Sequence, residues 1–185
     1  MMGPRTKLVL LASVFALPVA ASLAVYHFAR PEPTANYGEL LLPPATITTR
    51  AFADSSGARF TFTQLEGKWI LVVSDSGACA ASCMAKLTAL RQVRLALGRE
   101  AMRVERVFVV DDTLRPDAVA LKEFAGTVVA LNASGAAIPP GAVNDRDHIY
   151  LGDPRGNGMM RWPAGADRKR LLGDLQRLLK ASQIG

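Results

Sequence analysis

Hydrophobic and polar positions divide the chain into one long apolar run and a mixed remainder. Residues 8–29 contain no charged side chain, with Arg5 and Lys7 before them and Arg30 after them. A helix rises about 1.5 Å per residue, so this run can span a hydrocarbon core of about 30 Å. A cleaved signal peptide is the alternative, but its apolar core usually covers about 7–15 residues. The pattern therefore predicts a retained transmembrane helix, with residues 1–30 as the membrane anchor.

The rest of the chain divides into a linker and one domain. Residues 31–44 hold four prolines without a regular period, which is typical of an extended linker. Residues 45–185 then provide enough chain for one ordinary domain. Half of all residues are hydrophobic, which is sufficient for a packed core.

Short apolar stretches alternate with amphipathic ones inside this domain. Alternating or continuous apolar patterns predict strands at residues 45–50, 59–63, 69–73, 104–110, 127–131, 148–151 and 159–162. Three-and-four apolar spacing predicts helices at residues 81–97, 117–124 and 167–182. We expect the first two strands to pair with each other. On the first helix, Lys86 and Arg91 are expected on the solvent side.

The order of these elements predicts the fold class. A strand, a helix and a second buried strand imply a right-handed crossover and parallel pairing. The last two strands flank DPRGNG, a turn sequence typical of a hairpin. We therefore predict an α/β domain with a mixed sheet flanked by helices, preceded by one transmembrane helix.

The charge of the chain changes this interpretation little. The net charge is +6, of which three positive charges belong to residues 1–30. The densest basic run, RKR at 168–170, lies on a helix that also carries Asp167 and Asp174. This pattern is typical of a solvated helix face, so we expect no nucleic-acid partner. The basic residues before the apolar run favour a cytoplasmic N-terminus and a domain on the periplasmic side of the inner membrane.

The chemistry of the chain centres on its two cysteines. Cys79 follows a predicted core strand and Cys83 lies in the first turn of the next helix. In open α/β sheets, functional groups gather at the carboxyl ends of strands, and a helix N-terminus favours a thiolate. Outside the cytoplasm disulfides persist. The pair can therefore be a redox site, a ligand pair for Cu(I), or a structural disulfide.

A copper site needs a further ligand beside two thiolates. The chain has two histidines, and His27 lies in the anchor, so His148 is the candidate ligand. An ordinary hydrogen-bonded histidine at the start of a strand is an equal alternative for His148. The soft side chains of Met84, Met159 and Met160 are further candidates, although methionines in strands more often pack in the core.

Two segments give the chain a family resemblance. GKWILVVSDSGACAASCMAKLTALRQV at 67–93 and RVFVVDDTLRPD at 106–117 resemble the Sco proteins, which include SenC and PrrC-like members. The resemblance implies a thioredoxin-like domain that assists assembly of the copper centre of cytochrome c oxidase, with Cys79 and Cys83 as copper ligands. Met84 stands where the family usually has proline. The family's ligand histidine would be expected near Asp145 rather than at His148.

Three functions remain open from the sequence. The first is a copper-assembly factor that binds Cu(I) through Cys79, Cys83 and His148. The second is a thiol–disulfide oxidoreductase in which Cys79 attacks a partner and Cys83 resolves the mixed disulfide. The third is a tethered binding module with a structural cysteine pair. The expected partners are the inner membrane, through residues 8–29, and a cytochrome c oxidase subunit or another assembly factor.

Overall fold

The computed structural model describes residues 3–28, 36–46, 51–132, 145–182 and 184. The chain forms two separate units, Met1–Ala35 and Asn36–Gly185. In the first unit, helix α1 (Pro4–Phe28) contains Pro18 and is apolar throughout its centre. Its stretch from Pro4 to Tyr26 is long and apolar enough to cross a membrane.

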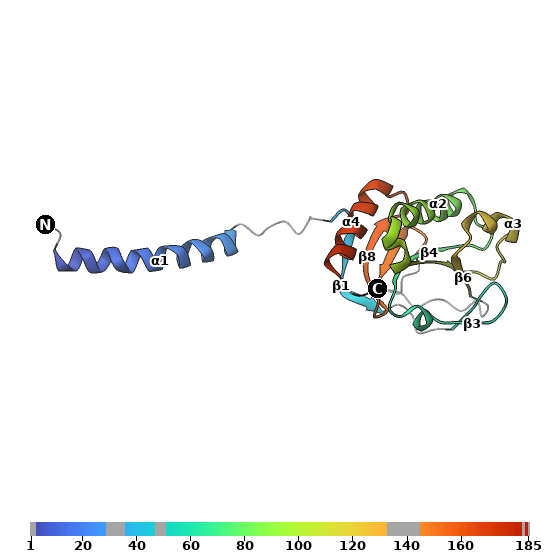
Figure 1. The fold of residues 1–185 in the computed structure, drawn as a ribbon, viewed down its shortest axis with the longest axis horizontal. Helices are drawn as coiled ribbons and strands as arrows, with labels where there is room; N and C mark the ends of the chain where they lie inside the picture. The colour runs from blue at the N-terminus through green and yellow to red at the C-terminus, as the bar shows by residue number, and fades with distance from the viewer. Residues whose placement is uncertain (1–2, 29–35, 47–50, 133–144, 183, 185) are drawn as a thin grey trace. The chain divides into compact units, whose positions relative to one another are not determined.

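The described residues of the second unit are built around one eight-stranded sheet (Figure 1). The strands are β1 (Glu39–Thr46), β2 (Phe52–Ala53), β3 (Arg59–Phe60), β4 (Trp69–Asp75), β5 (Val104–Val110), β6 (Thr127–Leu131), β7 (His148–Gly152) and β8 (Asn157–Pro163). Their order across the sheet is β1-β8-β7-β4-β5-β6-β2-β3. Strands β4, β5 and β6 run parallel, and all other neighbours are antiparallel. The predicted mixed sheet is therefore confirmed.

The helices of this unit come mainly from the predicted amphipathic stretches. The α-helices are α2 (Ala81–Ala96), α3 (Ala118–Leu121) and α4 (Arg168–Ala181). The 3-10 helices are η1 (Phe62–Leu65), η2 (Gly98–Arg103) and η3 (Lys122–Phe124). The predicted helix over 117–124 is thus a short α-helix continued by a 3-10 turn. Asp117 and Asp167 cap α3 and α4 by accepting hydrogen bonds from Val119 N and Arg170 N.

Two apolar layers cover the two faces of the sheet. Helices α2 and α4 lie side by side on one face, as Figure 1 shows. Their apolar stripes pack on one set of alternate strand residues, which includes Leu71, Val73 and Phe108. The opposite set, which includes Val72 and Val107, packs against the aromatic side chains of Phe52, Phe60 and Phe62. Strand β4 is buried along its whole length, as its continuous apolar run predicts.

The beginning of the domain differs from the prediction. The compact unit starts at Asn36 and β1 starts at Glu39, inside the segment 31–44 that the sequence assigned to a linker. Strand β1 pairs with β8 at one edge, whereas β2 and β3 form the opposite edge. The predicted pairing of 45–50 with 59–63 is therefore wrong for the described part of β1, because Ala45 and Thr46 pair with β8. Residues 47–50 lie outside the described residues.

Candidate redox site

The two cysteines form a disulfide where β4 leads into α2, with Cys79 in the connecting loop and Cys83 in the first turn of the helix. Cys79 and Cys83 are joined through their Sγ atoms, and their Cα atoms lie 5.0 Å apart. The Cys79 backbone has a φ of +40° and donates a hydrogen bond from its N–H to the Ser76 carbonyl. The loop therefore turns sharply at Cys79 and presents this residue ahead of the helix.

The two cysteines differ in burial. Cys83 is 1% exposed and belongs to the core layer between α2 and the sheet. Cys79 is only partly buried and packs at the margin of that layer. Cys79 is therefore the less buried of the two cysteines.

The N-terminus of α2, which follows the cysteine loop, has no side-chain cap. Its N-cap residue, Ala80, makes no side-chain capping bond, in contrast to the aspartate caps of α3 and α4. The first N–H groups of a helix lack partners within it and carry partial positive charge. This environment stabilises a thiolate when the disulfide is reduced.

The disulfide loop is fixed to the loop that follows β5. Asp112 Oδ1 accepts hydrogen bonds from Gly77 N at 3.0 Å and from Leu114 N at 3.1 Å. A Cβ atom at Gly77 would lie 2.0 Å from the Leu114 carbonyl oxygen, so only glycine fits this approach. Burial raises the pKa of Asp112, but hydrogen bonds from Ser76, Gly77 and Leu114 outweigh it and leave the pKa below its usual value.

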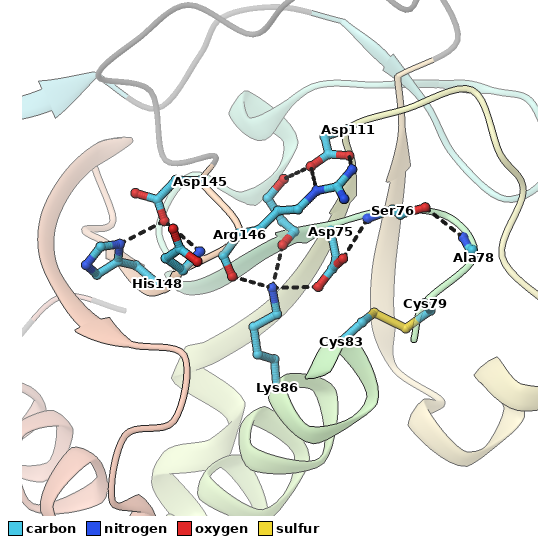
Figure 2. A network of polar contacts seen from close by, with 12 residues as sticks. Asp75, Ser76, Ala78, Cys79, Cys83, Lys86, Asp111, Asp145, Arg146 and His148 are labelled. Atoms are coloured by element: carbon cyan, nitrogen blue, oxygen red, sulfur yellow. Dashed lines mark hydrogen bonds and ion pairs between the residues drawn. A yellow bond between two sulfur atoms is a disulfide. The ribbon is translucent and has the colours of Figure 1, made fainter. Parts of the chain in front are cut away.

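A buried lysine lies beside the disulfide (Figure 2). Lys86 is 1% exposed and extends from α2 toward the carboxyl end of β4. Its Nζ atom donates to Asp75 Oδ2 at 2.8 Å, to the Ser74 carbonyl at 2.7 Å and to the Arg146 carbonyl at 2.8 Å. The prediction that Lys86 lies on the solvent side of its helix is therefore wrong. The signal for its burial is its position three residues after Cys83 and four before Leu90, on the apolar stripe of α2.

An exposed arginine joins the segment before β7 to the end of β5. Arg146 donates from Nε and Nη2 to the two carboxylate oxygens of Asp111, at 2.7 and 2.6 Å. The hydrogen bond with Asp111 raises the pKa of Arg146, and partial burial opposes this effect. The sequence places Asp111 directly after the predicted strand at 104–110 but gives no indication of a role for Arg146. Their pairing across 35 positions has no local sequence signal.

His148 lies in a separate cluster of polar side chains. Its Nδ1 atom is 2.8 Å from Asp145 Oδ1, and the Tyr150 hydroxyl donates to Asp145 Oδ2. Figure 2 shows the imidazole directed away from the disulfide, with Arg146 and Lys86 between them. Burial raises the pKa of Tyr150 to about 12, and the hydrogen bond to Asp145 is the second cause of this rise. Burial raises the pKa of Asp145, but the hydrogen bonds from Tyr150 and His148 outweigh it and lower the value overall.

The soft side chains that could complete a copper site do not gather around the cysteines. Met160 is fully buried opposite Leu151, which in turn pairs with Leu71 in the first half of β4. Met159 lines a pocket with Trp69, at the end of β4 remote from the disulfide. Within the described ranges, no three histidine, cysteine or acidic side chains form a metal-binding group. Met84, beside Cys83 on α2, is the one soft candidate that the described residues place near the pair.

The donor set therefore fits copper only in part. After reduction the cysteine pair offers two sulfur ligands, which suit Cu(I). The imidazole that would complete the set is directed away from the cysteine pair. Such a pair can receive a copper ion as cargo, but the described residues do not enclose it.

Comparisons with known proteins agree with this fold. Residues 69–182 match the family model of the transmembrane-like, thioredoxin-like, C-terminal domain. No curated protein matches the sequence at a significant level. Yeast Sco1 with copper bound is 19% identical, with a TM-score of 0.60 over 75% of this chain and 91% of that one.

Two further solved structures show the same likeness. Copper-bound ScoI from Arabidopsis thaliana is 16% identical, with a TM-score of 0.61 over 75% of this chain and all of that one. BsSco, described as having a disulfide switch and as a member of the Sco family of cytochrome c oxidase assembly proteins, is 14% identical, with a TM-score of 0.55 over 75% and 96% of the two chains. At these identities the likeness shows a shared fold.

Proposed function

Because the chain belongs to the family of transmembrane-like, thioredoxin-like C-terminal domains, we propose that it is a membrane-anchored thiol–disulfide oxidoreductase that acts on cysteine pairs during copper-centre assembly of cytochrome c oxidase. The observation that carries this proposal is the Cys79–Cys83 disulfide at the N-terminus of α2, with Cys79 partly buried and Cys83 buried. Its fold likeness to Sco proteins supports the assembly setting.

The unequal burial of the pair supports a different role for each cysteine. In the reducing direction, the Cys79 thiolate attacks one sulfur of a partner disulfide, and the other partner sulfur leaves as a thiolate. The Cys83 thiolate then attacks Cys79 Sγ, closes the intramolecular disulfide and releases the second partner thiolate. The partner gains two electrons, and an external dithiol must reduce the chain for another cycle.

The proposed location follows from the anchor. Arg5 and Lys7 precede the apolar part of α1, which favours a cytoplasmic N-terminus. The domain would then lie on the periplasmic side of the inner membrane, where thiol–disulfide exchange operates.

The reduction potential of the pair tests the proposal. We expect the full-length chain in detergent to show one reversible two-electron transition in glutathione buffers, with a midpoint above about −300 mV. Structural disulfides resist reduction and have potentials below about −300 mV. Alkylation of free thiols followed by mass measurement gives the reduced fraction, with the Cys79→Ala/Cys83→Ala variant as the blank. A pair that stays oxidised throughout the glutathione range would identify a structural disulfide instead.

Binding of Cu(I) as cargo is a second candidate function. It is supported by the copper-bound state of two Sco structures that share the fold and by the two sulfur ligands of the reduced pair. We expect the reduced full-length chain to bind one Cu(I) in an anaerobic titration against a competing chelator, and Cys83→Ser to lose this binding. His148→Ala should bind as the parent chain does, because the His148 imidazole is directed away from the cysteine pair. Weaker binding by His148→Ala would instead assign it as a ligand, and no binding by the parent would remove the copper function.

A further inference from the structure

Lys86 and Asp75 form an ion pair beside the cysteines that the proposed exchange reaction does not itself use. The three protons of the Lys86 ammonium have three acceptors: one carboxylate and two backbone carbonyls. Both Lys86 and Asp75 are buried. Charges are rarely placed in a protein interior, because taking them out of water is costly even when they are paired. A buried ion pair at this position is therefore unusual.

Each charged side chain is linked to one of the cysteines, Lys86 through the face of α2 and Asp75 through hydrogen bonds of Ser76. Cys83 and Lys86 are three residues apart on the buried face of α2, so their side chains lie on the same side of the helix. Asp75 Oδ1 accepts a hydrogen bond from Ser76 N at 2.8 Å, and the Ser76 carbonyl accepts one from Cys79 N. Figure 2 shows the Asp75 carboxylate between the Lys86 ammonium and the disulfide loop.

We propose that Lys86 and Asp75 are positioning residues whose opposite charges set the balance between the disulfide and dithiol states of Cys79 and Cys83. This inference rests on the proposed exchange function. The disulfide is neutral, whereas the reduced pair carries negative charge on the thiol that ionises. The ammonium stabilises that charge and the carboxylate opposes it, and both effects are strong where water is excluded. Reduction takes two electrons and two protons from an external dithiol, which becomes a disulfide, and the thiol that ionises then releases one proton to the solvent.

Single neutralising substitutions should shift the redox equilibrium in opposite directions. Lys86→Met leaves the carboxylate alone and disfavours the reduced pair. Asp75→Asn leaves the ammonium alone and favours the reduced pair. For each variant we expect at least a tenfold change in the equilibrium constant with glutathione, which corresponds to about 30 mV for a two-electron couple.

The free energy of unfolding of the same variants separates this role from a purely structural one. Each single variant leaves a buried charge without its partner, so both should lower the free energy of unfolding. A purely structural pair would therefore move both variants in the same direction, or leave the potential unchanged. The double variant Asp75→Asn/Lys86→Met removes both charges, and its equilibrium constant should lie within threefold of the parent value. If one single variant does not fold, the sign of the shift in the other single variant, compared with the double variant, still tests the inference.

A matched control comes from another buried carboxylate. Asp174→Asn should destabilise the domain through the loss of a buried charge but leave the glutathione equilibrium unchanged, because Asp174 contacts α4, β8 and the start of the domain rather than the cysteine loop. All variants are measured as full-length chains in detergent at one pH. Opposite shifts of Lys86→Met and Asp75→Asn support the inference.

Two outcomes overturn it in distinguishable ways. Shifts of the same sign in the single variants, or a tenfold shift in the double variant, would show that the pair does not act through its charges, while the parent chain still equilibrates with glutathione. A parent chain that does not equilibrate at all would remove the proposed exchange function and this inference together.

Discussion

A reduced Cys79→Ser chain forms no covalent link with a disulfide-bonded partner, whereas a reduced Cys83→Ser chain forms the link and stops there. This is the largest effect that we expect on activity, because each substitution removes one of the two steps completely. We expect a partner to react with Cys79, which is the less buried of the pair, and the 1% exposed Cys83 to react only with Cys79. Without Cys83, the mixed disulfide has no resolving thiol.

The experiment uses a synthetic peptide with two cysteines joined as a disulfide. The reduced full-length chains are incubated with this peptide, and the products are identified by non-reducing mass spectrometry. Ser82→Ala is the matched control, since Ser82 is an exposed residue between the two cysteines and should leave the rate within about twofold. A mixed disulfide formed by Cys79→Ser and absent from Cys83→Ser would reverse the assigned roles.

Asp174→Asn should cause the largest loss of stability, about 3 kcal/mol. The Asp174 carboxylate is fully buried and accepts hydrogen bonds from Trp162 Nε1 at 2.9 Å, Gly38 N at 2.8 Å and Tyr37 N at 3.1 Å, and it also pairs with Arg177. An asparagine side chain removes the charge and replaces one acceptor oxygen with a donor. At least one buried N–H group then loses its partner.

Thermal unfolding measures this loss. For a domain of this size, about 3 kcal/mol corresponds to a fall in Tm of about 10 °C. The matched control is Glu39→Gln, which breaks an exposed ion pair with Arg161 and should hardly change Tm. An Asp174→Asn domain as stable as the parent would show that the hydrogen bonds to Asp174 are not needed to hold Tyr37 and Gly38.

The same carboxylate predicts a dependence on pH. Burial raises the pKa of Asp174, but the hydrogen bonds from Trp162, Gly38, Tyr37 and Arg177 outweigh it and lower the pKa below its ordinary value of 3.8. A lowered pKa in the folded state means that the carboxylate stabilises the fold above pH 3.8, and that this contribution disappears as the pH falls through the folded-state value. The difference in Tm between the parent and Asp174→Asn should therefore narrow below about pH 4.

The centre of the fold could be predicted from the sequence because its signals are local. The continuous apolar run of β4, the three-and-four spacing of α2 and the short apolar run of β5 are each read within a few residues. Strand–helix–strand order then implies the parallel pairing that the structure shows. The position of the cysteine pair between β4 and α2 follows from the same signals.

The edges of the sheet could not be predicted in this way. Strand β1 pairs with β8, more than one hundred positions later in the chain, and no short-range pattern specifies that partner. The segment also contains Pro43 and Pro44, which favour a linker interpretation although an edge strand with an irregular register tolerates them. At the opposite edge, β2 is only two residues long and gives too short a pattern to recognise.

The polar contacts around the site could not be predicted from the sequence either, because they also join distant parts of the chain. Lysine is rarely buried, so a lysine in an amphipathic helix is expected on the solvent face. Lys86 is buried because acceptors from β4 and from the segment before β7 converge on it, and these elements are 12 and 60 positions away. The cysteine pair could be identified from residue types alone, whereas its charged neighbours depend on the tertiary fold.

The position of β1 determines where the folded domain can be separated from its anchor. A fragment that begins at residue 45, the predicted domain boundary, lacks most of β1 and all the backbone groups that Asp174 binds at Tyr37 and Gly38. It would expose the unpaired edge of β8, and open strand edges template association between chains. Protease cleavage inside residues 37–46 should therefore release an aggregation-prone product, whereas cleavage before Asn36 should release a soluble one.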